Sequence, residues 1–563
     1  MHHDASRAGS VEDVNTQTVS EKYTIMPSAG LLLFPEDVEK DDDMHAPDPS
    51  DRDKLTCSDL FSKRGCVNVS GLLFITVGVL LLFIGYPVLT FVQRLVEPEP
   101  LTCTHNPMCI DKNPPLLKNI RTSPIDPDTP DSVMRRIGDN GKSQRLVFSD
   151  EFNDPGRTFY DGDDPYWQAM DLWYGATMDL EWYDPDAVTT RDGVLQITFD
   201  AFANHGLNYR SGMLQSWNKM CFKGGFLEAS ISLPGTSSVP GFWPGFWTMG
   251  NLGRPGFLAT ADGLWPYSYA DVCDAGITPN QSSADGLSHL PGMRLPACTC
   301  PGADHPTPGR SRTAPEIDAL EASVEPLDGS SARVGTASQS FQTAPFDVWY
   351  RPDHEHQEVY DSRVTRLNRY AGGPFQQALS GLTTLHSDWY DGKAYQSYGF
   401  DYSPGATGSV AFTLGGTKTW KTTGQSIRPN GNIGQRVLPE EPLSIILNLG
   451  MSPGFSAIDF AALRPLMPAA LRVDYVRIYQ DAAGELTCDP AGYATTPYIA
   501  AHPAPYANPN LTRWHDTEHE QPRNAFMHAC QAAAPSPHQH DARAQRAKRA
   551  PDTSARSWRR PWS

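Results

Sequence analysis

The sequence predicts an all-β domain of the sandwich or barrel class, which follows a polar N-terminal tail and one membrane-spanning helix. From about Arg145 onward, short runs of strand-forming residues alternate with Gly, Pro, Asn and Asp, and no long helical periodicity separates them. The 46 Gly and 49 Pro also favour turn-rich β structure over helical bundles. An uncharged apolar run near the N-terminus predicts the membrane span.

Residues 1–70 form the predicted disordered tail. Most of this tail is polar and acidic, with the run Glu39-Lys40-Asp41-Asp42-Asp43, so it has little apolar surface to bury. The next run, Gly71–Val92, carries no charge and is long enough for a helix to cross a bilayer, which takes roughly 20 residues. A buried core helix is the alternative, but the run has no polar face.

Charged residues on the two sides of this run predict its orientation. Four basic residues precede it: Arg52, Lys54, Lys63 and Arg64. After it only Arg94 is close, and Glu97 and Glu99 follow. The positive-inside rule then places the N-terminus in the cytosol and the rest of the chain in the lumen or outside the cell. We therefore expect a type II membrane protein of the secretory pathway, in the ER, Golgi or plasma membrane.

The cysteine distribution agrees with this topology. Cys57 and Cys66 fall on the cytosolic side. The others fall on the oxidising side: Cys103, Cys109, Cys221, Cys273, Cys298, Cys300, Cys488 and Cys530. This number allows too many pairings for any to be assigned. Asn280 and Asn510 begin possible glycosylation triplets in the same compartment.

The exported part divides into three segments. Residues 93–143 are rich in Pro and Asp and predict a stalk or a strap on the domain. The β domain is expected over 144–530. Its predicted strands include Leu195–Phe199, Phe226–Leu233, Val410–Leu414, Ser444–Leu449 and Leu471–Tyr479. Residues 531–563 are basic and rich in Ala and Pro, which predicts a disordered tail.

Composition limits the partners. The net charge of −19 argues against nucleic acid, which attracts basic surfaces. The 13 Trp and 21 Tyr suit sugars, whose apolar C–H faces stack on flat rings, although core packing is the alternative use of such residues. No His or Cys cluster with ligand spacing accompanies the carboxylates described next, so we predict neither a metal nor a cofactor.

The strongest local signal is the run Pro315–Ser323, which contains Glu316, Asp318 and Glu321. On a regular strand Glu316 and Asp318 share a face, and Glu321 points away. One β-bulge between Asp318 and Glu321 returns all three to the same face. An acidic, solvated edge strand is the alternative. The dense aromatic run Gly241–Trp247 just upstream favours a sugar cleft instead.

Three convergent carboxylates suit retaining glycoside hydrolysis. One carboxylate attacks the anomeric carbon and a second protonates the leaving oxygen, with about 5–5.5 Å between the two groups. A third carboxylate between them can position the nucleophile, and its negative charge helps to keep the acid protonated.

The run E-I-D-x-x-E resembles the bulged catalytic motif of glycoside hydrolase family 16. Leu146–Asn153, Trp243–Gly250 and Val473–Gln480 resemble that family's first, aromatic and last strands. The chain resembles still more closely the fungal β-1,6-glucan synthesis-associated membrane proteins, over roughly residues 144–530. The stretches that carry this resemblance are Asp179–Gly193, Gly250–Thr260, Ala297–Pro306, Gly372–Ala378 and Asn508–Trp514.

This resemblance implies a concanavalin-like β-jelly-roll sandwich that acts on β-glucan of the cell wall. It implies Glu316 as nucleophile, Asp318 as its supporting acid and Glu321 as general acid/base, with Trp243 and Trp247 binding substrate. A retaining glycosidase or transglycosidase is the first hypothesis. A catalytically idle glucan-binding assembly factor is the second, and the retained carboxylates favour the enzyme. The basic tail after Cys530 departs from the family.

Residues 251–314 form a long Gly- and Pro-rich insertion between the aromatic and catalytic strands. The insertion contains Cys273, Cys298 and Cys300, and we expect disulfides to hold its shape. Loops of this length are uncommon unless they are functional. We therefore expect a lid that restricts which glucan enters, and a disulfide-stapled ornament away from the cleft is the alternative.

Overall fold

A computed structural model describes residues 63–89, 92, 121, 123–281, 288–327, 331–345, 352–528 and 530. The chain divides into two compact units, Met1–Leu101 and Thr102–Ser563, and each is described by itself. Most of the predicted N-terminal tail and the whole of the predicted tail 531–563 lie outside the described residues.

The described part of the first unit is one helix, α3 (Lys63–Leu80), which continues into a π-helical turn at Leu81–Gly85. Within it, Val69–Leu89 has a mean hydropathy of 2.5, and none of it is buried against protein. By length and composition this helix can cross a membrane, in agreement with the predicted span Gly71–Val92. The Thr76 hydroxyl donates to the Leu72 carbonyl, so this polar group is paired within the apolar helix.

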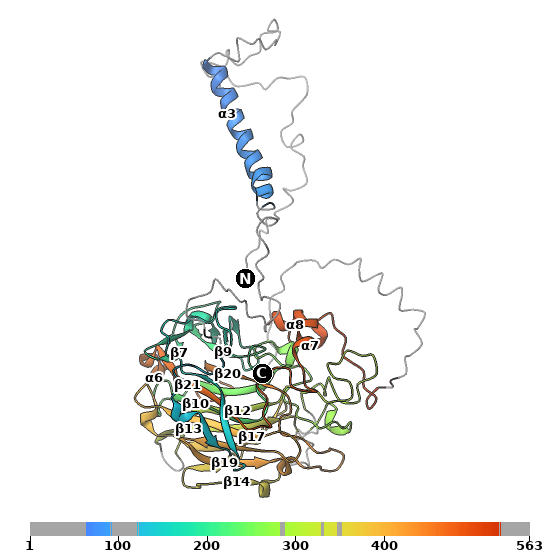
Figure 1. The fold of residues 1–563 in the computed structure, drawn as a ribbon. Helices are drawn as coiled ribbons and strands as arrows, with labels where there is room; N and C mark the ends of the chain where they lie inside the picture. The colour runs from blue at the N-terminus through green and yellow to red at the C-terminus, as the bar shows by residue number, and fades with distance from the viewer. Residues whose placement is uncertain are drawn as a thin grey trace, which may run out of the picture. The chain divides into compact units, whose positions relative to one another are not determined.

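The second unit is a sandwich of two antiparallel β-sheets (Figure 1). The first sheet has the order β1 (Arg135–Ile137), β2 (Ser143–Asp150), β21 (Ala469–Gln480), β10 (Gly225–Ser232), β17 (Gln396–Ser403), β18 (Ser409–Leu414), β19 (Thr417–Thr423) and β14 (Gln357–Val359). Two further strands extend it beside β21: β7 (Val194–Phe199) and β6 (Val188–Arg191).

The second sheet has the order β15 (Thr365–Leu367), β16 (Gln377–Thr384), β13 (Arg333–Thr343), β12 (Glu316–Pro326), β11 (Trp243–Gly250), β20 (Leu443–Gly450), β9 (Met213–Gln215) and β3 (Gln168–Ala169). The chain changes sheet between β10 and β11, between β16 and β17, and again between β19 and β20. This crossing pattern is that of a β-jelly-roll sandwich, as predicted.

The strands predicted from sequence are confirmed in both sheets. Phe226–Leu233 corresponds to β10, Ser444–Leu449 lies within β20, and the aromatic stretch Trp243–Gly250 is β11. Their alternating apolar residues meet in one core between the sheets, where Phe148, Phe246 and Trp420 are fully buried. Burial of this apolar surface is the main source of stability.

Smaller elements surround the sandwich. A third sheet joins β4 (Leu172–Trp173), β5 (Glu181–Tyr183) and β8 (Tyr209–Ser211), of which β5 and β8 run parallel. The described helices of this unit are short: α5 (Leu258–Ala261), α6 (Phe460–Leu463), α7 (Thr496–Ala501) and α8 (Pro503–Ala507).

The segment before residue 144 is part of the fold where it is described. Strand β1 pairs with β2. The backbone N–H of the buried Asp126 donates to the Ser149 hydroxyl, and the Asp126 carboxylate accepts from the Glu151 backbone N–H. The sandwich therefore includes residues on the N-terminal side of the predicted boundary at 144. Of the two alternatives for this segment, stalk or strap, residues 123–137 form a strap on the domain. Residues 93–120 lie outside the residues that the structure describes.

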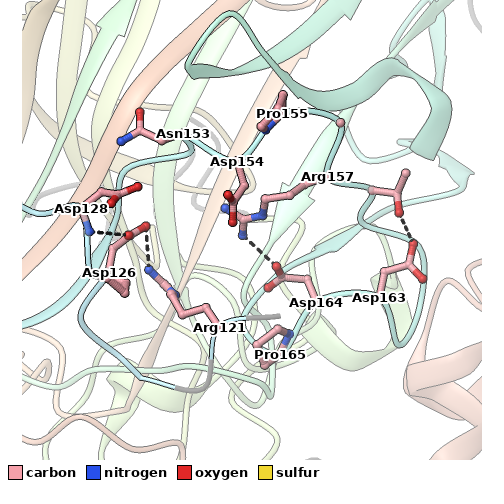
Figure 2. Close-up of a pocket in the computed structure, with 13 residues that line it drawn as sticks. Arg121, Asp126, Asp128, Asn153, Asp154, Pro155, Arg157, Asp163, Asp164 and Pro165 are labelled. Carbon is pink, nitrogen blue, oxygen red and sulfur yellow. Dashed lines mark hydrogen bonds and ion pairs between the residues drawn. The ribbon is translucent and has the colours of Figure 1, made fainter. Parts of the chain in front are cut away.

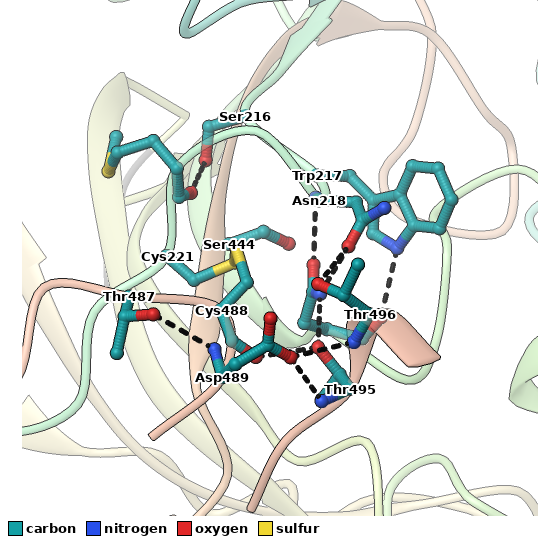
Figure 3. The surroundings of a disulfide bond; sticks show 12 residues. Ser216, Trp217, Asn218, Cys221, Ser444, Thr487, Cys488, Asp489, Thr495 and Thr496 are labelled. Atoms are coloured by element: carbon teal, nitrogen blue, oxygen red, sulfur yellow. Dashed lines mark hydrogen bonds between the residues drawn. A yellow bond between two sulfur atoms is a disulfide. The ribbon is translucent and has the colours of Figure 1, made fainter. Parts of the chain in front are cut away.

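Among the described residues of the second unit, three disulfides form: Cys221–Cys488, Cys273–Cys298 and Cys300–Cys530. The first and the third join segments that are distant in the sequence, and the second lies within the insertion. Figure 3 shows the first of these, beside which the Asp489 carboxylate accepts hydrogen bonds from the backbone N–H groups of Thr495 and Thr496. The expected stapling of the insertion is confirmed, since Cys273, Cys298 and Cys300 are all bridged.

Candidate active site

The three predicted carboxylates lie on one face of β12. Asp318 pairs with Ser340 of β13, whereas Glu321 pairs with Ser338, so the register shifts between Asp318 and Glu321. This is the predicted β-bulge, and it is confirmed. Ile317 is buried in the core between the sheets, so Glu316, Asp318 and Glu321 project from the opposite face.

The register of the sheet brings the aromatic strand next to them. Trp247 of β11 lies directly opposite Asp318, and Gly245 lies opposite Glu321. Directly opposed residues of antiparallel strands share a face, and so do alternate residues of one strand. Trp243 and Trp247 therefore stand on the carboxylate face, where both are half-buried. The predicted substrate-binding residues and the predicted catalytic residues are thus brought together.

Each carboxylate has its own hydrogen-bond donors. The Trp265 Nε1–H donates to Glu316 Oε2 at 2.6 Å, and the Trp243 Nε1–H donates to Glu321 Oε1 at 3.2 Å. Asp318 Oδ2 accepts from the Ser340 hydroxyl at 2.6 Å and from Gln342 Nε2 at 3.0 Å. Asp318, the carboxylate between the two glutamates, thus accepts the most hydrogen bonds.

Burial and mutual repulsion raise the pKa of all three groups. The Asp318 side chain is 2% exposed; burial raises its pKa to about 6, and hydrogen bonds from Ser340 and Gln342 oppose the rise. Burial, followed by the charge of Asp318, raises the pKa of Glu321 to about 8. Burial and the charges of Asp318 and Glu321 raise the pKa of Glu316 well above its ordinary value.

These shifts make the cluster suitable for acid–base chemistry near neutral pH. A hydrogen bond from Glu316 to Asp318 raises the pKa of Glu316 and lowers that of Asp318, so the two groups hold one proton between them. Glu321 keeps its proton until the pH approaches 8. The arrangement therefore offers one anionic pair and one neutral acid on the same surface.

The insertion reaches this surface through Trp265, which belongs to residues 251–314 and binds Glu316. Trp265 packs with Trp247 against a second hydrophobic cluster that contains Leu264 and Leu295 of the insertion and Met249 of β11. The insertion, which we expect to act as a lid, therefore contacts the predicted nucleophile Glu316 directly. Sequence reasoning did not identify Trp265, because nothing local in a Gly- and Pro-rich loop marks it.

Sequence reasoning also missed a second pair of buried carboxyl groups, Asp179 and Glu181, which are 4% and 0% exposed. The Tyr183 hydroxyl donates to Asp179 Oδ2 at 3.0 Å, and Asn448 Nδ2 donates to the Tyr183 oxygen at 3.0 Å. The Trp247 Nε1–H donates to Asn448 Oδ1 at 2.8 Å, which connects the pair to the carboxylate face. The i, i+2 spacing of the two acids, Asp179 just before the short strand β5 and Glu181 at its start, was the available signal.

A surface cavity of about 620 Å³ lies elsewhere, on the strap and the loop after β2 (Figure 2). Within it the Arg157 guanidinium donates to Asp164, and Arg121 donates to Asp126. None of the predicted site residues lines this cavity. Its charged side chains largely satisfy one another, so we assign it no role in the chemistry.

Comparison with known proteins places the chain in context. A family described as "Beta-glucan synthesis-associated protein SKN1/KRE6/Sbg1" matches residues 31–530. The chain is 48% identical over 519 residues to the β-glucan synthesis-associated protein KRE6 of Saccharomyces cerevisiae. The aligned region covers 90% of this chain and 70% of that protein. It is 47% identical over 513 residues to the β-glucan synthesis-associated protein SKN1 of Candida albicans. The aligned region covers 88% of this chain and 68% of that protein.

Solved structures are similar at lower identity. The endo-β-1,3-glucanase from Pyrococcus furiosus has a TM-score of 0.36 and 19% identity, covering 62% of this chain and 98% of its own. The laminarinase from Rhodothermus marinus has a TM-score of 0.35 and 17% identity, covering 60% of this chain and 97% of its own.

Proposed function

Because the chain belongs to the SKN1/KRE6/Sbg1 family of β-glucan synthesis-associated proteins, we propose that it is a retaining glycosidase or transglycosidase that remodels β-glucan, β-1,6-glucan in particular, during cell-wall assembly. The observation that carries this proposal is the convergence of Glu316, Asp318 and Glu321 on the face that also presents Trp243 and Trp247. Binding alone needs no group of three carboxyls on one face of a strand.

In the proposed reaction Glu316 attacks the anomeric carbon, and Glu321 gives its proton to the departing glycosidic oxygen. Asp318 takes the proton that Glu316 holds at rest, so Glu316 becomes the anion as the substrate binds. The hydrogen bonds from Ser340 and Gln342 fix Asp318 in place for this exchange. Glu321 then deprotonates either water or a sugar hydroxyl, which attacks the glycosyl-enzyme and gives a product of retained configuration.

The proposed site lies on the lumenal or extracellular side of a type II membrane protein. The apolar helix Val69–Leu89 and the disulfides found among the described residues of the second unit support this placement. Basic residues before the helix, Lys63 and Arg64 among them, support a cytosolic N-terminus.

The test is product analysis with the full-length protein in detergent, on defined β-1,3- and β-1,6-gluco-oligosaccharides. Glu316→Gln keeps the shape of the side chain and removes the attacking anion, so turnover should fall at least about a hundredfold while the fold persists. Glu355→Gln, which changes an exposed carboxyl outside the site, should have no effect. If cells that carry Glu316→Gln assemble wall glucan normally, the protein acts instead as a glucan-binding assembly factor.

A further inference from the structure

Three oxygen atoms converge on the backbone of Gly450, at the end of β20. A Cβ atom at Gly450 would lie 3.2 Å from Glu181 Oε1, 3.2 Å from Tyr183 Oη and 3.5 Å from Asp179 Oδ2. All three side chains are at least nine-tenths buried, and within the described part of the chain neither carboxyl group forms an ion pair. Two buried carboxyls this close, with no cation beside them, cannot both be ionised.

The hydrogen bonds around Tyr183 run in one direction. An indole N–H only donates, so the Trp247 contact requires Asn448 to present its oxygen to Trp247. The Asn448 amide nitrogen then donates to the Tyr183 oxygen, and the Tyr183 hydroxyl gives its own proton to Asp179. Asp179 is therefore the acceptor at the end of a chain that begins at Trp247, and its carboxylate form, which only accepts, suits this role.

A second set of contacts connects the same pair to Trp243. The Met451 backbone N–H donates to both Glu181 oxygens, at 3.2 and 3.1 Å. Met451 begins a loop whose Phe455 ring stacks on Trp243, with 4.1 Å between ring centroids and 3° between planes. Trp243 in turn donates to Glu321. Glu181 therefore contacts the first residue of the loop that stacks on Trp243.

We propose that Asp179 and Glu181 share one proton and act as positioning residues, which hold the Trp247 and Trp243 indoles in place to bind a glucan chain. The pair touches neither the reacting atoms nor the solvent. Burial raises the pKa of Asp179 to about 6 and that of Glu181 well above its ordinary value, with the charge of Asp179 as the second cause for Glu181. Glu181 is therefore the group that holds the proton and donates it to Asp179.

This assignment predicts opposite outcomes for two conservative substitutions. In Glu181→Gln the amide N–H replaces the carboxyl proton, and the carbonyl oxygen still accepts from Met451. The Asp179 carboxylate accepts from three donors: the Thr177 hydroxyl, the Tyr183 hydroxyl and the Glu181 carboxyl proton. Asp179→Asn replaces one of the two acceptor oxygens with an NH2 group, so one of these donors loses its acceptor. Tyr183→Phe keeps both carboxyls and removes the hydroxyl that connects Asp179 to Asn448.

The experiment measures KM and kcat on gluco-oligosaccharides, and oligosaccharide affinity in the Glu316→Gln background, for the full-length protein. We expect Asp179→Asn and Tyr183→Phe to raise KM and the dissociation constant about tenfold with kcat little changed, and Glu181→Gln to raise them clearly less than Asp179→Asn does. The exposed Glu355→Gln variant is the unchanged control. Thermal unfolding verifies that each variant folds. Equal damage from Glu181→Gln and Asp179→Asn, or an unchanged affinity in Tyr183→Phe, would overturn the proposal.

The positioning role of Asp179 and Glu181 rests on the proposed function in one respect: it assumes that the ligand is a glucan. If the unmodified protein turns over none of these oligosaccharides, the enzyme reading fails, but the affinity measurements still decide whether the pair positions the tryptophans. If turnover is normal and the three variants bind alike, the positioning role fails and the enzyme reading stands.

Discussion

The indole N–H of Trp265 donates to Oε2 of Glu316 over 2.6 Å, so the insertion between β11 and β12 contacts the proposed nucleophile directly. This donor lowers the pKa of Glu316 against the effects of burial and of neighbouring carboxylates. Trp265→Phe keeps an aromatic ring and removes the donor, which raises the pKa of Glu316 further. We expect a lower kcat/KM and an acidic limb of the pH–rate profile that moves to higher pH.

Trp243→Phe is the matched control, because Trp243 makes the corresponding hydrogen bond to Glu321. That bond lowers the pKa of Glu321, so its loss should move the alkaline limb to higher pH and leave the acidic limb in place. If both variants shift the same limb, the two carboxyl groups do not have separate roles.

The unmodified protein should show a bell-shaped dependence of kcat/KM on pH. Below about pH 6 the Glu316–Asp318 pair keeps both protons and provides no anion for attack. Above about pH 8 Glu321 has lost the proton that the leaving group needs. Activity should therefore be greatest between these values, and the limbs report the coupled cluster as a whole. A profile that rises continuously to pH 9 would exclude Glu321 as the acid.

Chemical rescue tests the role of Glu321 separately. Glu321→Ala removes the acid/base, and activity should fall by about 10²–10⁴-fold on natural glucans. The loss should be smaller on substrates with a good leaving group, which needs little protonation. Added azide should replace water in the second step and give a glycosyl azide of retained configuration. Asp318→Asn, with its orienting role, should show an intermediate loss and no rescue.

The site could be predicted from sequence where its geometry is local. Glu316, Asp318 and Glu321 lie within six residues of one strand, so the period of two and a single bulge place them on one face. The Trp243 and Trp247 neighbours were predicted because their strand precedes the acidic run and is rich in aromatics. The membrane helix was predicted by its composition alone.

Contacts between distant segments could not be predicted in this way. Trp265 reaches Glu316 from the turn that follows the short helix α5, and no sequence period fixes where its side chain points. Asp179 and Glu181 acquire their role only because Asn448 and Met451, near the end of β20, lie beside them. Strand β1 likewise pairs with β2 at the edge of the folded sheet, and this pairing partner cannot be recognised from the local sequence. The composition of residues 93–143 suggested a stalk or a strap instead.

Orientation in the membrane is testable in sealed vesicles. Because basic residues precede the apolar helix, we expect the N-terminal tail on the cytosolic side and the β-sandwich inside. Added protease should then remove only the tail, and detergent should expose the sandwich to digestion. Asn280 and Asn510, which are exposed, should accept glycans in the same lumenal location. Digestion of the sandwich in intact vesicles would reverse the orientation.

The Cys273–Cys298 disulfide should hold the insertion in place over the carboxylates. It joins two ends of a segment whose own apolar cluster is small, with Tyr267, Ile277 and Met293 among its buried members. Since such a bridge contributes about 2–4 kcal/mol, its loss should open this segment locally and leave the core between the two sheets intact. In the Cys273→Ala/Cys298→Ala variant we expect protease cleavage within residues 251–314 and reduced activity.

Two measurements separate this local effect from general unfolding. Hydrogen exchange should stay slow in β10 and β20, which lie in the core, and become fast around Trp265, which would no longer be held against Glu316. The acidic limb of the pH–rate profile should move in the same direction as in Trp265→Phe, because both variants remove the same hydrogen bond. A protease-resistant insertion with an unchanged profile would show that Trp265 is held by packing against Trp247 and Leu264 and not by the disulfide.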